Sequence, residues 1–344
     1  MCLKCACGGN IQGCEDRRVS WRPKIERPKG NWYDFLRAHR EQCRSALAMG
    51  GPDEEQLVAQ LYDRVTDVRA LETAWRFLEA HERANPGTTG FAPAVGLSDK
   101  EIRRVVKHLR SMLRKPGYVP DAIDYDGWPL ASRFDKQVGQ KAMCLIVEPL
   151  LVHGLDPLTL SAGSEDDRQN SLSVSCDLAE TSNRLVWARV SVREPFDRVP
   201  EKSLFDLVWD GMPNNRCVEL IVDLTGLPSP TGIFRGCRLS ELLIEFYLDR
   251  MVVRKWHEVH KNVPILRSGA EFLILCRKKD GAERMRADLL EIIREAGMPV
   301  DEAGESSICD LNAGDSVEWL GYTISRQAGE WVYEPVGSVE GSFS

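Results

Sequence analysis

The sequence has no apolar run of the roughly 20 residues that a membrane-spanning helix needs, so we expect no such helix. No apolar signal-peptide core opens the chain, whose first residues are rich in Cys and Gly. An excess of positive charge is also missing, because the formal net charge is −7. This argues against nucleic-acid binding over the whole surface but leaves room for a local basic face. We expect a cytoplasmic protein with no membrane partner.

The composition is that of a globular protein rather than a disordered one. Hydrophobic residues make up 43% and charged residues 28% of 344 residues, which is enough for two or three domains. Most of the cysteines beyond the first fifty residues lie in apolar segments. Reduced, buried thiols are therefore expected, as is usual in the cytoplasm.

Four further cysteines crowd the N-terminal segment, which we expect to be a Cys-rich tail or linker over residues 1–30. Four thiolates can hold zinc tetrahedrally, so a metal site is the alternative interpretation. Against it, the spacing is shorter than that of an ordinary zinc ribbon or finger. The candidate ligands are Cys2, Cys5, Cys7 and Cys14.

Residues 31–115 are predicted to be mainly helical, because apolar residues recur at helical spacing in 54–64 and 67–83. Ser98 and Glu101 form a capping-box pattern that starts another helix. One face of that helix is apolar and the other basic, which suits phosphate contacts or, alternatively, an ordinary solvated surface. The basic face comprises Arg103, Arg104, Lys107, Arg110, Arg114 and Lys115, of which Arg103, Lys107 and Arg110 are the candidate nucleic-acid ligands.

Residues 263–276 read as two short apolar strands around the turn 268–271, which predicts a β-hairpin. An amphipathic helix should follow over 282–298, with Gly297 as its stop signal.

The neighbours of this hairpin follow one another in the order of the reverse-transcriptase motifs. Tyr118 and Pro120 precede a helix that begins around Asp135, Lys136 and Gln140 and is expected to end at Glu148-Pro149. A strand ending at Ser191 leads to a Phe196-Asp197 turn, and later the segment VEWLGYTI forms a further strand. The best-matching stretch, GIFRGCRLSELLIEFYLDR, supplies Gly232, Gly236, Leu239, Ser240, Leu242, Leu243, Tyr247, Leu248 and Asp249. Between Leu71 and Tyr333 the chain thus resembles bacterial reverse transcriptases of the group II intron and retron kind.

This resemblance implies an α+β fold with a polymerase palm, an antiparallel sheet carrying helices on one face. It implies a helical region and mainly helical fingers at 31–185, the palm at 186–334 and a flexible tail at 335–344. The thumb would be missing, because the chain stops soon after the last expected palm strand. By position in the motifs, the resemblance also implies nucleic-acid contacts by Lys136, Gln140, Arg235, Gly236 and Ser240.

The chain differs from this family at the positions of the catalytic metal ligands. Ser191 and Ala270 occupy the two main metal-binding Asp positions, and only Glu271 is acidic, at the third position. Nucleotidyl transfer needs two metal ions about 3.5–4 Å apart, held by carboxylates, and one carboxylate cannot hold both. The family's triphosphate-binding cations are also missing from the segment DAIDYDGWPLAS.

We therefore expect a reverse-transcriptase-like protein that has lost polymerase activity, needs no cofactor and binds RNA or a partner protein, such as an active reverse transcriptase. The first alternative is an active RNA-directed DNA polymerase that uses Mg²⁺ with unusual ligands. If the alignment were shifted, Asp197, Asp223 or Asp249 could serve as such ligands. The second alternative is a decaying copy from a mobile element with no selected function.

Overall fold

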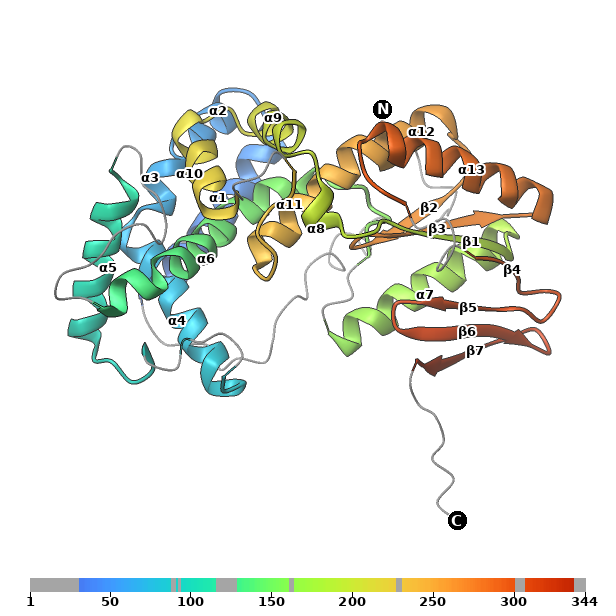
Figure 1. Cartoon of the computed structure of the whole chain (residues 1–344), viewed down its shortest axis with the longest axis horizontal. Helices are drawn as coiled ribbons and strands as arrows, with labels where there is room; N and C mark the ends of the chain where they lie inside the picture. Colours follow the sequence, from blue (N-terminus) through green and yellow to red (C-terminus); the bar gives the residue numbers. More distant parts are fainter. Residues whose placement is uncertain are drawn as a thin grey trace, which may run out of the picture.

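The computed structural model describes residues 31–87, 91, 94–115, 129–160, 164–226, 231–300 and 307–336, without the side chains of 31–33 and 129–133. The candidate zinc ligands Cys2, Cys5, Cys7 and Cys14, like Tyr118 and Pro120, lie outside these ranges. The protein is α+β, with a helical part beside a part built on antiparallel sheets (Figure 1). None of the helices in the described ranges combines the length and the apolar character that crossing a bilayer requires.

The helical part is organised around one long central helix, α6, which packs against most of the others (Figure 1). The basic helix begins, as predicted, at a capping box formed by Ser98 and Glu101. Two helices from beyond residue 185, α9 and α10, also lie in this part. Its elements are α1 (Asn31–Met49), α2 (Pro52–Ala59), α3 (Leu61–Val65), α4 (Val68–Ala84), α5 (Asp99–Leu113), α6 (Pro129–His153), α9 (Glu201–Gly211) and α10 (Asn215–Thr225).

Helix α6 does not end at Glu148-Pro149, as the sequence suggested, but continues to His153 with Pro149 inside it. A proline in a helix removes one backbone donor. Beside this proline, His39 Nε2 lies 2.8 Å from the carbonyl oxygen of Ile146, while Arg64 lies 2.9 Å from His39 Nδ1. Because Arg64 can only donate, His39 must donate from Nε2 to Ile146. This side chain from α1 supplies a donor close to the interruption, and packing holds the helix together beyond it.

The four-stranded sheet has the antiparallel order β2-β3-β1-β4. The predicted hairpin is confirmed as β2 and β3. Helices α11 and α13 share a core with one face of this sheet, through Val190 and Ile274 among others. Helix α13 ends as predicted, since Gly297 has a φ of 69° and Met298 N donates to Ile293 O at 3.1 Å. The elements are β1 (Val186–Ser191), β2 (Ile265–Ser268), β3 (Glu271–Cys276), β4 (Ile308–Asp310), α11 (Arg238–Leu248) and α13 (Lys279–Glu295).

The opposite face of the sheet is covered as well. Trp187 and Leu273 pack with Cys176 of α7 (Glu165–Ser182) and with a second antiparallel sheet (Figure 1). That sheet has the order β5-β6-β7 and consists of β5 (Ser316–Trp319), β6 (Tyr322–Gln327) and β7 (Glu330–Pro335). The four-stranded sheet thus lies between helices on one side and α7 with a second sheet on the other.

Within the described ranges the cysteine thiols are reduced and mostly buried, as the sequence predicted. The seven cysteines described there are free, and six of them are buried. Burial raises the pKa of Cys217 to about 12 and that of Cys276 to about 11. These side chains are small core residues, and burial disfavours the reactive thiolate.

One glycine allows the loop 231–237 to pack tightly on α8 (Pro195–Arg198). Gly232 has a φ of 89°, and an added Cβ would lie 2.9 Å from Asp197 O and 3.0 Å from Phe196 O. Ile233 N donates to Phe196 O at 2.7 Å across the same contact. Gly232 therefore serves the approach of two segments of this chain, rather than the approach of a nucleic-acid duplex. By contrast, Gly236 has a φ of 98° and open space around it.

We expect Gly232→Ala to lower the free energy of unfolding by about 2–4 kcal/mol, the sum of a strained backbone and a displaced neighbour. Gly236→Ala is the matched control and should cost only about 1–2 kcal/mol, because it carries the backbone strain without the clash. Urea unfolding followed by circular dichroism measures both values. Equal losses in the two variants would contradict the close packing at Gly232.

Candidate functional site

The three positions at which the sequence resemblance would place metal ligands lie together at one end of the β1–β3 pair. Ser191 is the last residue of β1, and its cross-strand partner is Glu271. Gly269, with a φ of 56°, makes a two-residue turn with Ala270, as type II′ hairpins require. The carbonyl of Ala270 accepts a hydrogen bond from Val192 N at 3.0 Å. We call this group of residues, Ser191, Ala270 and Glu271, the strand end.

The single carboxylate of the strand end is already paired with a cation. Arg189 donates to Glu271 Oε1 at 2.9 Å, and a second nitrogen of the same guanidinium lies 3.8 Å from Glu318 of β5. The Arg189 side chain is only 13% exposed and that of Glu271 is 35% exposed. In such partly desolvated surroundings a fixed positive charge strongly opposes the approach of another cation.

The strand end does not fit a pair of Mg²⁺ ions. Its oxygens are one neutral hydroxyl, one carbonyl that already accepts from Val192 N and one carboxylate held by an arginine. A two-metal site needs several carboxylate oxygens shared between the ions. Across the part of the chain that the structure describes, no group of three or more His, Cys, Asp or Glu side chains is arranged to hold a metal ion.

The aspartates considered as alternative ligands each have another environment. Asp197 accepts a hydrogen bond from Arg235 at 2.8 Å. Asp223 lies on α10, where burial and the nearby Glu219 raise the pKa of its carboxyl group.

Asp249, the third of these aspartates, is fully buried in a π-helical turn, η4 (Asp249–Val253), between α11 and α12 (Arg254–Val259). Its two oxygens accept from Asp156 N at 2.7 Å and Arg254 Nε at 3.3 Å. This carboxylate therefore ties the helix to the segment that follows α6.

A second arginine lies beneath the hairpin turn. Arg267 of β2 is 1% exposed, and burial lowers the pKa of its guanidinium. It donates to Gly269 O at 2.8 Å, to Glu245 O at 3.1 Å and to Thr159 Oγ1 at 3.3 Å. It thus joins the turn to α11 and to the segment after α6. The only sequence signal for Arg189 and Arg267 is a charged residue inside an otherwise apolar strand.

Cations and aromatic rings meet at the loop 231–237. Lys136 Nζ lies 4.6 Å from the centre of the Phe234 ring, and the Arg235 guanidinium lies 5.8 Å from that of Phe196. Arg235 and Gly236 are exposed, while Phe196 and Phe234 are half-buried. We call these five residues the loop surface. Of the motif-derived candidates, it brings together Lys136, Arg235 and Gly236.

Two other candidates are buried and cannot meet a nucleic acid in this structure. Ser240 is 0% exposed, and its backbone N–H is capped by Cys237 Sγ at 3.4 Å. Gln140 is 4% exposed and donates from Nε2 to Leu224 O at 2.7 Å. In this structure Ser240 serves a helix cap and Gln140 a contact between α6 and α10, so neither side chain is on the surface where the expected contact would form.

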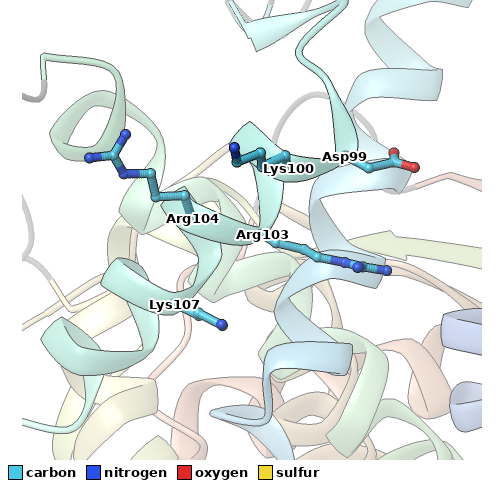
Figure 2. A pocket seen from close by; sticks show the side chains of 5 residues that line it. All are labelled: Asp99, Lys100, Arg103, Arg104 and Lys107. Atoms are coloured by element: carbon cyan, nitrogen blue, oxygen red, sulfur yellow. The ribbon is translucent and has the colours of Figure 1, made fainter.

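The remaining candidates, Arg103, Lys107 and Arg110, lie together on the exposed side of α5. Figure 2 shows the first half of this surface, where Lys100 and Arg104 extend to one side of α5, Arg103 and Lys107 extend to the other, and Asp99 lies at the helix start. Asp99 is paired with Arg76 of α4, and Arg103 Nε lies 3.9 Å from Glu72. We call the side chains Lys100, Arg103, Arg104, Lys107, Arg110, Arg114 and Lys115 the α5 face.

Comparisons with known proteins give only a distant likeness. No family model matches the chain, and no curated protein matches it. The structure is similar to apo telomerase from Candida tropicalis, with a TM-score of 0.45 and 12% identity, over 57% of this chain and 41% of that one. It is also similar to telomerase from Candida albicans in complex with a fragment of telomeric RNA, with a TM-score of 0.43 and 11% identity, over 60% and 42%. The chain thus spans about two fifths of these telomerases.

We expect Arg189→Met to lower the free energy of unfolding by about 1–3 kcal/mol, because it leaves a partly buried carboxylate without its partner. Glu271→Gln should cost less than about 1 kcal/mol, because the side chain is more exposed and keeps a hydrogen-bond acceptor. Denaturant unfolding of both variants and of the double variant measures the coupling between them. Strictly additive losses would show that the ion pair contributes nothing in solution.

Proposed function

We propose that this protein is a reverse-transcriptase-like scaffold that binds RNA and has lost nucleotidyl transfer. The observation that carries the proposal is the strand end, where Arg189 pairs with the one remaining carboxylate, that of Glu271. Ser191 and Ala270 stand at the other two positions, so the ligands for two catalytic metal ions are missing. In this proposal residues 31–185 form the helical region and fingers, and residues 186–334 form the palm.

Binding of RNA is supported by the chemistry of the loop surface. Single-stranded nucleic acids are held by bases that stack on aromatic rings and by cations that contact the backbone. Phe196 and Phe234 supply the rings, and Lys136 and Arg235 supply the cations within a few ångström of them. Gly236 leaves open space beside Arg235, so a strand can approach this surface closely.

A primer-extension assay tests the loss of activity. Pure protein is incubated with a primed RNA template, deoxynucleotides and either Mg²⁺ or Mn²⁺. We expect no extension, because one arginine-bound carboxylate cannot hold two metal ions. Extension that disappears in Glu271→Ala would instead establish an active polymerase with unusual ligands.

Fluorescence anisotropy with a labelled single-stranded RNA tests the binding. We expect Phe234→Leu to weaken binding about tenfold, since a stacked base contributes about 1–3 kcal/mol. Lys261→Gln is the control, because this exposed lysine lies in the turn after α12, away from the loop surface. If the wild-type protein binds no RNA, or if both variants lose affinity equally, the proposed RNA binding at this surface fails.

A further inference from the structure

The α5 face differs in kind from the loop surface. From Ile102 to Lys115 the chain contains no Asp or Glu and no Phe, Tyr or Trp. Its apolar residues in this stretch are buried, so cations dominate the exposed side, with only His108 and Ser111 between them. From Lys100 to Arg110 this surface can attract phosphates strongly but offers no Phe, Tyr or Trp ring of its own for a base to stack on. At its far end the half-buried ring of Tyr62 lies 5.6 Å from the Arg114 guanidinium.

Two of the acids near this face are engaged elsewhere, and two, Glu72 and Asp63, pair with Arg103 and Arg114 of the face itself. At the helix start Asp99 pairs with Arg76 of α4, and Glu101 accepts a hydrogen bond from Ser98 N at 2.8 Å within the capping box. At the far end Asp63 pairs with Arg114 at 2.7 Å. Between them, Lys100 and Lys107 make no ion pair with any residue that the structure describes. These two lysines therefore keep their positive charge available to a ligand.

The spacing of the cations suits a long, rigid ligand. Lys100, Lys107 and Arg114 recur every seven residues, close to two helical turns, so their backbone positions lie in one row along α5. Arg103 and Arg110 form a parallel row beside it. At 1.5 Å per residue the row from Lys100 to Arg114 is about 21 Å long. Because α5 is a continuous helix, the row is straight and its geometry is fixed before a ligand arrives.

Two modes of RNA recognition can be distinguished on these grounds. Proteins hold single strands by stacking exposed bases, whereas double-stranded RNA is recognised mainly through its shape and its backbone phosphates. A straight row of cations that carries no Phe, Tyr or Trp ring from Lys100 to Arg110 suits the second mode. The loop surface, which has rings, suits the first.

We propose that the α5 face binds the phosphate backbone of double-stranded RNA without reading its sequence, separately from the single strand at the loop surface. This inference rests on the proposed function for the choice of RNA over DNA. It adds a second contact surface, made by a different helix, and assigns a duplex to it. The protein would thereby hold an RNA that carries both a helix and an unpaired segment.

Fluorescence anisotropy titrations test this inference with three probes. The probes are a blunt RNA duplex of about 20 base pairs, one of its single strands and the DNA duplex of the same sequence. The key variant is Lys100→Gln/Lys107→Gln/Arg110→Gln. Each lost phosphate contact lowers the slope of log affinity against log salt by about 0.9. We therefore expect the triple variant to lower this slope by about 2–3 and to bind duplex RNA about 10–100-fold more weakly. The affinity for the single strand should stay within about twofold of the wild-type value, because in this proposal the α5 face contacts only the phosphates of the duplex.

The matched control is Lys261→Gln/Arg277→Gln/Lys278→Gln, which removes the same charge from exposed positions outside α5. It should retain duplex affinity and salt dependence. All six substituted positions are exposed, and circular dichroism verifies that the variants fold. The single variant Lys107→Gln should lower the slope of log affinity against log salt by about 1. Equal losses in the two triple variants would overturn the assignment to α5.

The remaining outcomes separate this inference from the proposed function. Binding of single-stranded RNA without binding of the duplex overturns the inference and leaves the proposed function intact. Tighter binding of duplex DNA than of duplex RNA overturns the choice of RNA. Failure to bind any of the three probes contradicts both the inference and the RNA-binding function.

Discussion

The ion pair between Arg189 and Glu271 determines what the end of the β1–β3 pair can do. Polymerases of the palm type bring divalent cations to such a strand end, and acidic side chains hold them there. Here a side chain of the protein itself supplies the cation, 2.9 Å from the one acid that remains. Glu318 of β5 lies close to the same guanidinium, so the pair also connects the two sheets. The end of the sheet is therefore electrostatically satisfied without an added ion.

The residues around this ion pair hold the hairpin in place. Arg267 lies beneath the turn and binds the backbone of the turn to α11, and Ile265 and Leu266 of the same strand are buried. Gly232 brings the loop 231–237 against α8, which holds Phe196 and Phe234 beside the cations of the loop surface. The same scaffold thus positions the loop surface, while a salt bridge engages the carboxylate of the strand end. The α5 face belongs to a separate helix and is independent of this arrangement.

The sequence predicted best those features that depend on neighbouring residues. The hairpin around Gly269, the capping box of Ser98 and the stop at Gly297 follow local rules of turn and helix chemistry, and all three are confirmed. Features that depend on distant partners were missed or misassigned. Pro149 was taken as a helix end, and Gln140 was assigned to nucleic acid although its partner is the Leu224 carbonyl, 84 positions away. Arg189 could not be singled out, because its pairing requires the register between β1 and β3.

Binding of Mn²⁺ at the strand end, followed by electron paramagnetic resonance, tests the central claim most directly. The wild-type protein should show no bound Mn²⁺ there, because its donors are neutral or already paired. Ser191→Asp/Ala270→Asp, which returns carboxylates to the two positions, should bind Mn²⁺, and should do so more tightly when Arg189→Gln is added. Two Mn²⁺ ions bound by the wild-type protein, and lost in Glu271→Gln, would contradict the account.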